Sequence, residues 1–340
     1  MEVCTNCFTD KELRGFISSS KKSGDCKICN SSNVPLISIE ELLDFFQELL
    51  DNFHIVADGE SLKSKIQKNW SFFTSDKIAI KILDEVLPKL STNILSPEDI
   101  VDYNADIIEN FMYWEKLKEE LKWSKRFISN IDYLVELGWD GFFNTQFELR
   151  PKDNLFRARV HHQSGLKSYS PDEMKSPKPE LVVGGRANPS GIPYLYLSDN
   201  PDTVLYEVRA SYLDELSIAR FQLKEEFDSI KIVDFTEDTP LFQPTKVNET
   251  IKASLLRKEI SRDLSKPMRR YDSEIEYIPT QFICEFINVF TGANGIRFNS
   301  SLHISGKNIV IFNQEFMECK DVQLKKVNSL KLTAIEHKCL

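Results

Sequence analysis

Residues 185–198 read GRANPSGIPYLYLS, a turn-rich segment that leads directly into a short strand. Glycine and proline between Gly185 and Pro193 favour turns, and the aromatic and aliphatic run that follows is typical of a strand. Arg186 lies in the turn, and a guanidinium matches a phosphate through paired hydrogen bonds. Tyr196 lies on the strand and offers a flat face for an aromatic ring and a polar tip. The stretch therefore predicts a loop and a strand that present ligand-binding groups.

Similar groups occur in the segments on both sides of this stretch. The sequence LFRAR at 155–159 predicts a strand that carries Arg157. A helix that begins near Asp199 presents Glu207 about one turn in, and a carboxylate can hold a ribose hydroxyl and stabilise an oxocarbenium ion. The sequence GIRFNSS at 295–301 predicts a strand that ends in two hydroxyls. Together these parts suit a dinucleotide with a cleavable N-glycosidic bond, although each residue taken singly also fits an ordinary surface or core position.

The C-terminal half alternates strands and helices from about Asn154. The predicted strands are Leu155–Val160, Tyr194–Leu197, Ile218–Leu223, Ile230–Phe235, Gly295–Asn299 and Asn308–Phe312, and the predicted helices are Asn248–Leu264 and Pro279–Phe290. Residues 164–184 are rich in proline and charge and predict a loop, which we expect to act as a lid over the site. This pattern predicts an α+β domain over residues 150–325.

Four cysteines in the first 30 residues form two CxxC pairs, Cys4 with Cys7 and Cys26 with Cys29. Each two-residue gap lets both thiolates point at one tetrahedral ion, which is the spacing of a zinc site. Because sulfur fills all four positions, none remains for water or substrate, and we expect the zinc to be structural. Residues 1–35 are therefore predicted to be a zinc-binding unit that stabilises the fold or binds a partner protein. A nucleic-acid-binding zinc ribbon is the alternative.

Residues 36–145 are predicted to form a helical bundle. The candidate helix starts are Ser38 with Glu41 in a capping box, Ser75, and Ser96 followed by Pro97. A long helix is predicted from about Ala105 to Phe127, with apolar residues at three- and four-residue spacing. The only histidine in this zone is His54, and no arginine lies within several residues of it. We therefore interpret the zone as a scaffold and not as a ribonuclease-like active site.

Composition and charge narrow the class of protein. Of the 340 residues, 41% are hydrophobic and 28% are charged, as in ordinary globular proteins. The net charge of −9 argues against a general nucleic-acid binder, which needs surplus lysine and arginine to neutralise phosphates. No apolar stretch follows a basic N-terminal segment, and no run of about 18 apolar residues occurs, so we expect neither a signal peptide nor a membrane span. The cysteine usage fits reduced thiols, so a cytoplasmic location is expected.

The ordered set LFRAR, GRANPSGIPYLYLS, TVLYE, GIRFNSS and KNIVIF resembles the RES domain, named for an arginine, a glutamate and a serine. The resemblance covers about residues 150–325 and implies an ADP-ribosyltransferase-like fold that binds NAD⁺. The N-terminal zone resembles, through less specific motifs, the HEPN/RES N-terminal domain of larger RES proteins. The predicted fold class is thus α+β: an ADP-ribosyltransferase-like mixed-sheet domain preceded by a small zinc-binding unit and a helical bundle.

The resemblance also implies roles for the matching residues. The expected NAD⁺-binding residues are Arg157, Arg186, Tyr196 and Ser300, and the expected catalytic residues are Glu207, Arg157 and Ser300. The arginines are expected to bind a phosphate or a ribose. The tyrosine is expected to stack on the nicotinamide or to orient the ribose. Ser301 directly follows the family's serine. The family's turn usually carries an aromatic residue after Gly-Arg, whereas this chain has Ala187, which removes a packing contact.

The function implied by the resemblance is NAD⁺ consumption. RES domains cleave the bond between nicotinamide and ribose, as glycohydrolases or phosphorylases, and many act as toxins in RES–Xre toxin–antitoxin pairs. A protein ADP-ribosyltransferase is the alternative within this class, and a non-enzymatic nucleotide- or nucleic-acid-binding adaptor is the alternative outside it. Because NAD⁺ loss would harm the cell that makes the protein, we expect control by an antitoxin-type partner or by residues 1–145. The expected partners are thus NAD⁺ and such a protein, with a homo-oligomer left open; no membrane is expected, and nucleic acid is disfavoured but stays an alternative.

Overall fold

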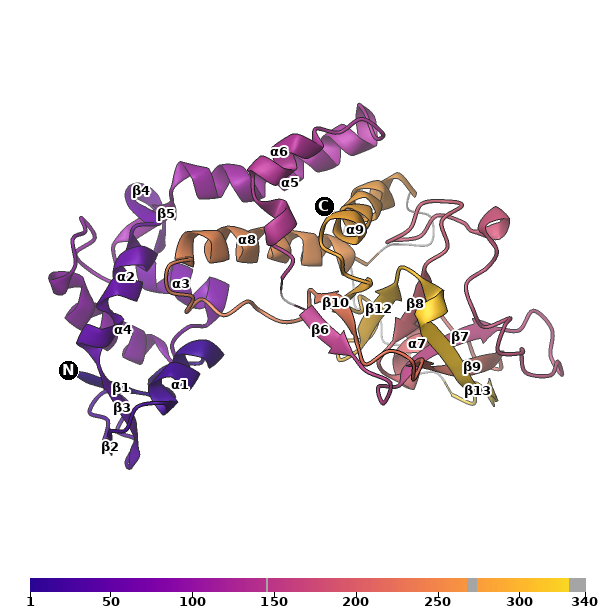
Figure 1. Ribbon diagram of the computed structural model, residues 1–340, viewed down its shortest axis with the longest axis horizontal. Helices are drawn as coiled ribbons and strands as arrows, with labels where there is room; N and C mark the ends of the chain where they lie inside the picture. The colour runs from indigo at the N-terminus through magenta and orange to yellow at the C-terminus, as the bar shows by residue number, and fades with distance from the viewer. Residues whose placement is uncertain (145, 268–273, 330–340) are drawn as a thin grey trace, which may run out of the picture. The chain divides into compact units, whose positions relative to one another are not determined.

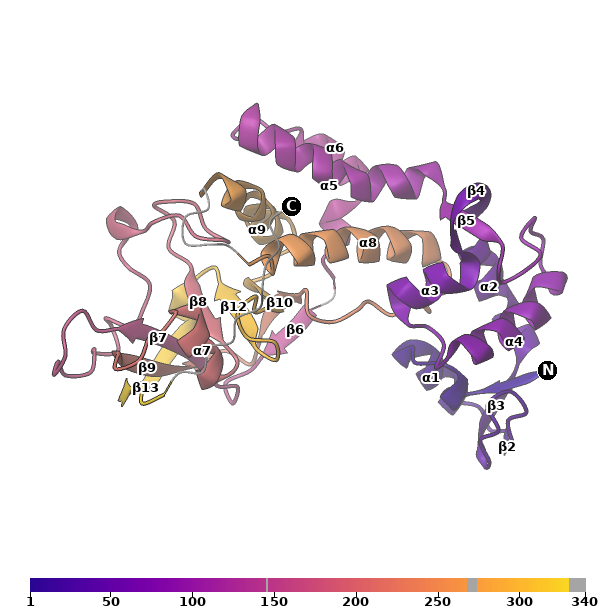
Figure 2. The ribbon, with the colours of Figure 1, turned by 180° about the vertical axis from the view of Figure 1, so that it is seen from behind.

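The computed structural model describes residues 1–144, 146–267 and 274–329. These residues form two compact units. Unit 1 comprises Met1–Leu117, Asn130–Phe142 and Glu237–Glu259, and unit 2 comprises Lys118–Ser129, Phe143–Thr236 and the chain from Ile260 onward. Figures 1 and 2 show that unit 1 is mainly helical and that unit 2 is built on a sheet. Unit 1 thus includes one segment from the C-terminal half of the chain.

Unit 1 contains short helices and two small sheets. Its elements are β1 (Glu2–Cys4), α1 (Lys11–Ser18), β2 (Ser23–Gly24), β3 (Val34–Ser38), α2 (Leu43–Leu50), β4 (Phe53–Ser61), α3 (Leu62–Trp70), α4 (Asp76–Val86), β5 (Ile100–Tyr103), α6 (Ile131–Glu136) and the larger parts of α5 (Ala105–Trp123) and α8 (Val247–Leu264). The predicted capping box at Ser38 and Glu41 is confirmed, as is the cap of α4, where the Ser75 side chain accepts a hydrogen bond from the Ile78 N–H. The long helix α5 ends at Trp123, before the expected Phe127.

The helix predicted to start at Ser96 is wrong. The Asp99 carboxylate accepts hydrogen bonds from the backbone N–H groups of Leu95 (2.7 Å) and Ser96 (3.0 Å), and this closes a turn. The chain then continues as β5, which pairs antiparallel with β4. Two β-branched residues at the start of β5 favour this extended backbone over a helix. The zone from residue 36 to residue 145 is therefore helical with a two-stranded sheet, and not a pure helical bundle.

One hydrophobic core joins the cysteine-rich N-terminus, the helices that follow it and residues 237–259. Asp10 ties the three together. One carboxylate oxygen caps α1 by accepting the Leu13 N–H at 3.0 Å. The other accepts the N–H groups of Leu241 (2.7 Å) and Phe242 (3.2 Å). A chain truncated to begin at Gln146 would therefore leave the 237–259 segment without the core that covers its apolar side chains.

Unit 2 is built on one eight-stranded sheet in the order β13-β9-β7-β8-β12-β11-β10-β6. The strands are β6 (Gln146–Leu149), β7 (Leu155–Val160), β8 (Leu195–Ser198), β9 (Glu215–Leu223), β10 (Ile230–Asp234), β11 (Gly295–Asn299), β12 (Lys307–Ile311) and β13 (Met317–Lys326). The pair β10–β11 is parallel and the other pairs are antiparallel, so the predicted α+β class with a mixed sheet is confirmed. Helices α7 (Pro201–Glu207) and α9 (Ile278–Phe290) belong to the same unit.

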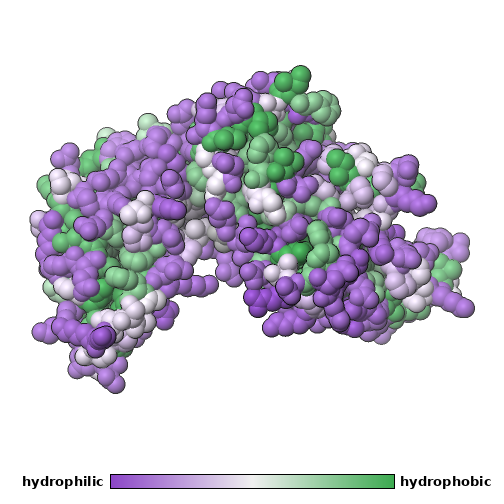
Figure 3. Space-filling model, viewed as in Figure 1, coloured by the Kyte–Doolittle hydropathy of each residue, from purple (hydrophilic) through white to green (hydrophobic). Residues whose placement is uncertain are grey.

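Apolar side chains from alternating positions of these strands form the core of unit 2. In β9, for example, Ala219, Phe221 and Leu223 are buried. Hydrophilic residues predominate on the face shown in Figure 3, with hydrophobic ones interspersed.

The loop predicted at 164–184 is anchored to the sheet over part of its length. Met174 is fully buried in the core, and the Ser176 hydroxyl donates to the backbone carbonyl of Tyr194 at 2.7 Å. Arg159 on β7 donates to the carbonyl of Lys175 at 2.7 Å. This part of the expected lid is therefore fixed in place.

Replacing Asp10 with alanine tests the shared core of unit 1. The Asp10→Ala change removes a helix cap and leaves two buried backbone N–H groups without an acceptor, so we expect a loss of about 2–4 kcal/mol in the free energy of unfolding. Urea unfolding measures it. Asp44 lies exposed in the first turn of α2, and the matched Asp44→Ala variant should differ from the unmodified chain by less than about 0.5 kcal/mol. Equal effects of the two substitutions would contradict the anchoring role of Asp10.

Candidate functional site

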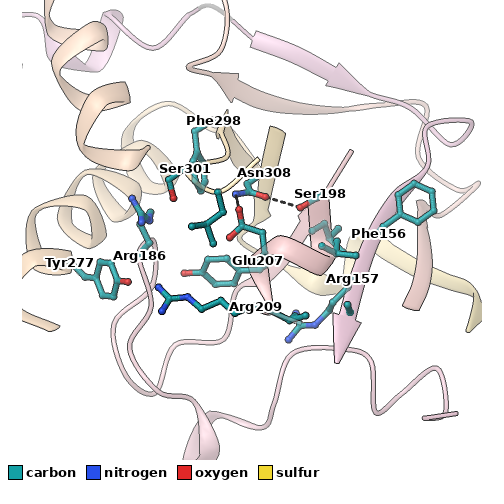
Figure 4. Close-up of a pocket in the computed structure, with 16 residues that line it drawn as sticks. Phe156, Arg157, Arg186, Ser198, Glu207, Arg209, Tyr277, Phe298, Ser301 and Asn308 are labelled. Carbon is teal, nitrogen blue, oxygen red and sulfur yellow. Dashed lines mark hydrogen bonds between the residues drawn. The ribbon is translucent and has the colours of Figure 1, made fainter. Parts of the chain in front are cut away.

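A cavity of about 410 Å³ opens at the centre of the unit 2 sheet, which is within the range of small-molecule sites. Its lining comes from β7, β8, α7, β11 and β12 and from the loops beside them (Figure 4). The lining residues are Phe156, Arg157, Ala158, Arg186, Tyr196, Leu197, Ser198, Val204, Glu207, Val208, Arg209, Tyr277, Phe298, Ser301, Leu302 and Asn308. Four of the residues predicted from the sequence, Arg157, Arg186, Tyr196 and Glu207, thus meet at one cavity.

Glu207 is the last residue of α7. The Asn200 side chain caps this short helix, and Pro201 occupies its first turn. The carboxylate is exposed, yet its Oε1 atom is fixed by two donors. The hydroxyl of Ser300 donates at 2.6 Å and the side-chain amide of Asn308 donates at 2.8 Å. Both donors are neutral side-chain groups.

Ser300 is a buried residue that sits behind the cavity lining. Its Oγ atom accepts hydrogen bonds from the backbone N–H groups of Leu302 (3.2 Å) and His303 (3.1 Å) while its own proton goes to Glu207. These contacts orient the hydroxyl toward the carboxylate. Of the two adjacent serines, Ser301 is the one that lines the cavity. The adjacent serines therefore have separate places, one holding the glutamate and one facing the cavity.

Asn308 completes the support of Glu207 and was not identified from the sequence. It lies on β12 opposite Ser198 of β8, and the Ser198 hydroxyl donates to its side-chain oxygen at 2.7 Å. That bond leaves the amide nitrogen free to turn toward Glu207. In the sequence, the only indication of this role was that Asn308 is the single polar residue in the otherwise apolar stretch NIVIF at 308–312.

Arg157 lies on β7 with its Nη1 atom fully buried and without a hydrogen-bond partner among the residues that the structure describes. Burial, together with the nearby charge of Arg159, lowers the pKa of Arg157 to about 10. The group still carries its charge at neutral pH. A buried cationic nitrogen with no acceptor is unfavourable by itself, and an anion that enters the cavity would relieve that cost.

Arg186 has a different environment, because it closes the C-terminal end of α8. Its Nη1 atom donates to the backbone carbonyls of Asp263 (3.2 Å) and Leu264 (2.6 Å), and its Nη2 atom donates to that of Lys266 (2.8 Å). The last carbonyls of a helix attract cations of this kind. The guanidinium also lies 5.6 Å from the ring centre of Tyr277, a second lining residue missed in the sequence. Burial lowers the pKa of Arg186.

Tyr196 fixes the turn that precedes it. Its hydroxyl donates to the side-chain oxygen of Asn188 at 2.7 Å and accepts the backbone N–H of Ala187 at 2.9 Å. A Cβ atom at Gly185 would lie 2.7 Å from the same hydroxyl, so glycine is required there. Ala187, where the family usually carries an aromatic residue, is fully buried. Burial raises the pKa of the Tyr196 phenol, and the ring remains on the cavity wall.

The four N-terminal cysteines also come together, in unit 1. Their sulfur atoms all lie within 4.8 Å of one another. The individual separations include 3.8 Å for Cys4–Cys7, 3.4 Å for Cys4–Cys29 and 3.6 Å for Cys7–Cys26. Sulfurs about 2.3 Å from one tetrahedral ion would be about 3.8 Å apart. Burial raises the pKa of Cys4 to about 12 and also raises that of Cys7, so thiolates at these positions need a cation.

Among the described residues, no helix is long and apolar enough to cross a membrane.

Comparison with known proteins agrees with the geometry of the site. The family model of the RES domain matches residues 154–333, just over half of the chain. The match begins beside β7, so it covers the strands and helices that line the cavity and does not extend to the cysteine cluster. Searches of curated proteins and of solved structures returned no match. The chain therefore belongs to the RES domain family, a family of NAD-related toxin domains.

Proposed function

We propose that this chain is an enzyme that consumes NAD⁺ by cleaving the bond between nicotinamide and ribose. The observation that carries the proposal is the fixed, charged carboxylate of Glu207 in a cavity lined by arginines. Such a carboxylate can stabilise the positive charge that develops on a ribose ring as its substituent leaves. Family membership supports NAD⁺ as the substrate.

The NAD⁺ pyrophosphate is assigned to the neighbourhood of Arg157. The unpartnered Nη1 atom of that residue supplies a buried donor, and a phosphate oxygen is its natural acceptor. Arg186 uses three N–H bonds on backbone carbonyls, so its main contribution is to hold the 185–193 turn against α8. The ring of Tyr196 provides a flat wall for the ribose or the nicotinamide.

Glu207 is proposed to act at the reacting ribose. Its Oε1 atom is fixed by Ser300 and Asn308, so its Oε2 atom is positioned to accept a hydrogen bond from a ribose hydroxyl. As the bond between C1′ and the nicotinamide nitrogen breaks, its electron pair goes to the nicotinamide, which leaves neutral. With water as acceptor, an oxygen–C1′ bond forms and one proton is released, so the products are ADP-ribose, nicotinamide and a proton.

The acceptor is determined by access to C1′ and not by the groups that hold the dinucleotide. Apart from Glu207, the described residues that line the cavity include no carboxylate, histidine or lysine that could serve as a base. A weakly activated acceptor suits a transition state with much oxocarbenium character. Water gives ADP-ribose, whereas inorganic phosphate gives ADP-ribose 1″-phosphate, and the arginine-rich lining favours phosphate as a second candidate. Either reaction would deplete NAD⁺, as a toxin or defence effector does, and so we propose an antitoxin-type protein that holds the activity in check.

We further propose that the cysteine cluster binds one structural zinc ion. All four ligands are sulfur and three of them are fully or nearly fully buried, which suits a closed tetrahedral site. The cluster is part of the unit 1 core, so the ion would stabilise that unit and would take no part in the reaction.

Glu207→Gln tests the role of the carboxylate. Glutamine keeps the shape and the hydrogen-bond acceptor but removes the charge, so we expect nicotinamide release to fall by about 100-fold or more. Chromatography of nicotinamide over time gives the rate. Glu225 is an exposed glutamate of unit 2 outside the cavity, and Glu225→Gln should leave the rate within about twofold of the unmodified chain. A Glu207→Gln variant that releases nicotinamide at the unmodified rate would contradict the proposed mechanism.

Arg157→Met tests whether the buried guanidinium is kept for a ligand. The substitution removes an unpaired buried cation, so the free energy of unfolding should stay the same or rise, by up to about 2 kcal/mol. Nicotinamide release should fall by about 100-fold. Arg159→Met on the same strand, where the side chain binds a loop carbonyl, provides the comparison and should retain activity. Loss of stability without loss of activity in Arg157→Met would show a structural role instead.

Metal analysis of the purified chain should find about one zinc ion per chain. Cys7→Ser should lose the ion and destabilise unit 1, because one of four ligands and a buried sulfur contact disappear. Thermal unfolding with and without a chelator measures the effect. Cys284 is a buried cysteine outside the cluster, and Cys284→Ser should retain the zinc. Absence of metal from a folded, unchelated preparation would contradict the assignment.

A further inference from the structure

Arg209 lies two residues beyond Glu207, where the chain leaves α7, and its backbone is in the left-handed region with φ of 51°. The turn is closed by backbone hydrogen bonds from Arg209 to the Tyr206 carbonyl (2.9 Å) and from Ala210 to the Leu205 carbonyl (3.0 Å). Helices often end on a residue in this conformation, but glycine or asparagine usually fills the position because other side chains are strained there. An arginine at this point is therefore kept at a conformational cost.

The side chain of Arg209 is exposed and lines the cavity together with those of Arg157 and Arg186. In Figure 4, Arg186 and Arg209 lie on one side of Glu207, toward Tyr277, and Arg157 lies on the other. Among the described lining residues, the charged groups are thus three guanidinium groups and one carboxylate. Such a surplus of positive charge matches an anionic ligand with more than one phosphate.

The three arginines are not equivalent. Arg186 is bound to the carbonyls at the end of α8, and Arg157 is partly buried on β7 with one buried nitrogen unpaired. Arg209 is the exposed member of the set and comes from a turn directly attached to the glutamate helix. A guanidinium there can donate hydrogen bonds to the solvent-facing phosphate of a bound pyrophosphate, while Arg157 donates to the buried phosphate.

We infer that Arg209 is a substrate-binding residue that holds the solvent-facing phosphate of a pyrophosphate-bearing nucleotide. This assignment rests on the proposed function for the identity of the substrate, and it adds a phosphate contact that the sequence did not predict. The left-handed backbone directs the side chain to the cavity, so the strain at residue 209 is balanced by ligand binding.

The strain alone does not identify a ligand contact, and the chain offers a matched control. Leu213 is also in the left-handed region, with φ of 71°, and its exposed side chain does not line the cavity. Glycine at either position relieves the same backbone strain. Only glycine at position 209 should affect the ligand.

The test compares Arg209→Gly, Arg209→Ala, Arg209→Lys and Leu213→Gly in the full chain. Calorimetry measures the Kd for ADP-ribose and for nicotinamide riboside, which has no phosphate, and nicotinamide release gives KM and kcat for NAD⁺. Loss of one charge-assisted contact should raise the Kd for ADP-ribose and the KM for NAD⁺ by about tenfold or more in Arg209→Gly and Arg209→Ala, with kcat within about threefold. Arg209→Lys should recover part of the loss, and the Kd for nicotinamide riboside should change by less than about twofold.

Thermal unfolding separates ligand binding from folding. Arg209→Gly and Leu213→Gly should melt no lower than the unmodified chain, and Leu213→Gly should leave both Kd values unchanged. An unchanged Kd for ADP-ribose in Arg209→Gly, or an equal loss of nicotinamide riboside binding, would overturn the inference. If no variant and not even the unmodified chain releases nicotinamide, while ADP-ribose binding still depends on Arg209, the phosphate contact stands and the proposed cleavage fails.

Discussion

The fixed Oε1 atom of Glu207 is the constraint on which the candidate site depends. Two parts of the chain that are distant in sequence meet at it: the end of α7, and the neighbouring elements after and beside β11, namely the turn that carries Ser300 and strand β12 with Asn308. Asn308 is itself oriented by Ser198, so the chain of hydrogen bonds reaches across two strands. Both donors are neutral groups that fix the position of this oxygen. Fixed placement of an acceptor is one property that stabilisation of an oxocarbenium ion requires.

The arginines of the cavity differ in role: Arg186 holds the structure of the wall, whereas Arg157 and Arg209 are proposed to bind the ligand. Arg186 and Tyr196 fix the turn that begins at Gly185, since one binds the end of α8 and the other binds Ala187 and Asn188. The segment that most clearly marks the family in the sequence is thus largely a scaffold for the cavity wall. We propose that anion binding falls to Arg157, whose buried nitrogen has no partner among the described residues, and to the exposed Arg209. If an anion binds in this cavity, it should raise the free energy of unfolding of the chain.

The sequence predicted the elements whose pattern is local. Strands β7 and β11 have the bounds that the sequence predicted. Helices α8 and α9 each begin one residue before their predicted first residue. β13 was missed because an edge strand that reads MECKDVQLKK has little apolar alternation and is stabilised by pairing with β9. Asn308 was missed for a related reason, because its role depends on its register with Ser198, more than 100 residues away. The membership of residues 237–259 in unit 1 likewise depends on long-range contacts with Asp10 and the N-terminal core.

The cleavage of NAD⁺ by the unmodified, full-length chain is the central claim. Its most direct test is a mass balance in phosphate-free buffer, in which NAD⁺, nicotinamide and ADP-ribose are quantified by chromatography over time. We expect NAD⁺ loss to equal nicotinamide release, with ADP-ribose formed in the same amount; adding phosphate should change only the identity of the ribosyl product. Intact NAD⁺ after prolonged incubation with a folded chain that binds ADP-ribose would contradict the account.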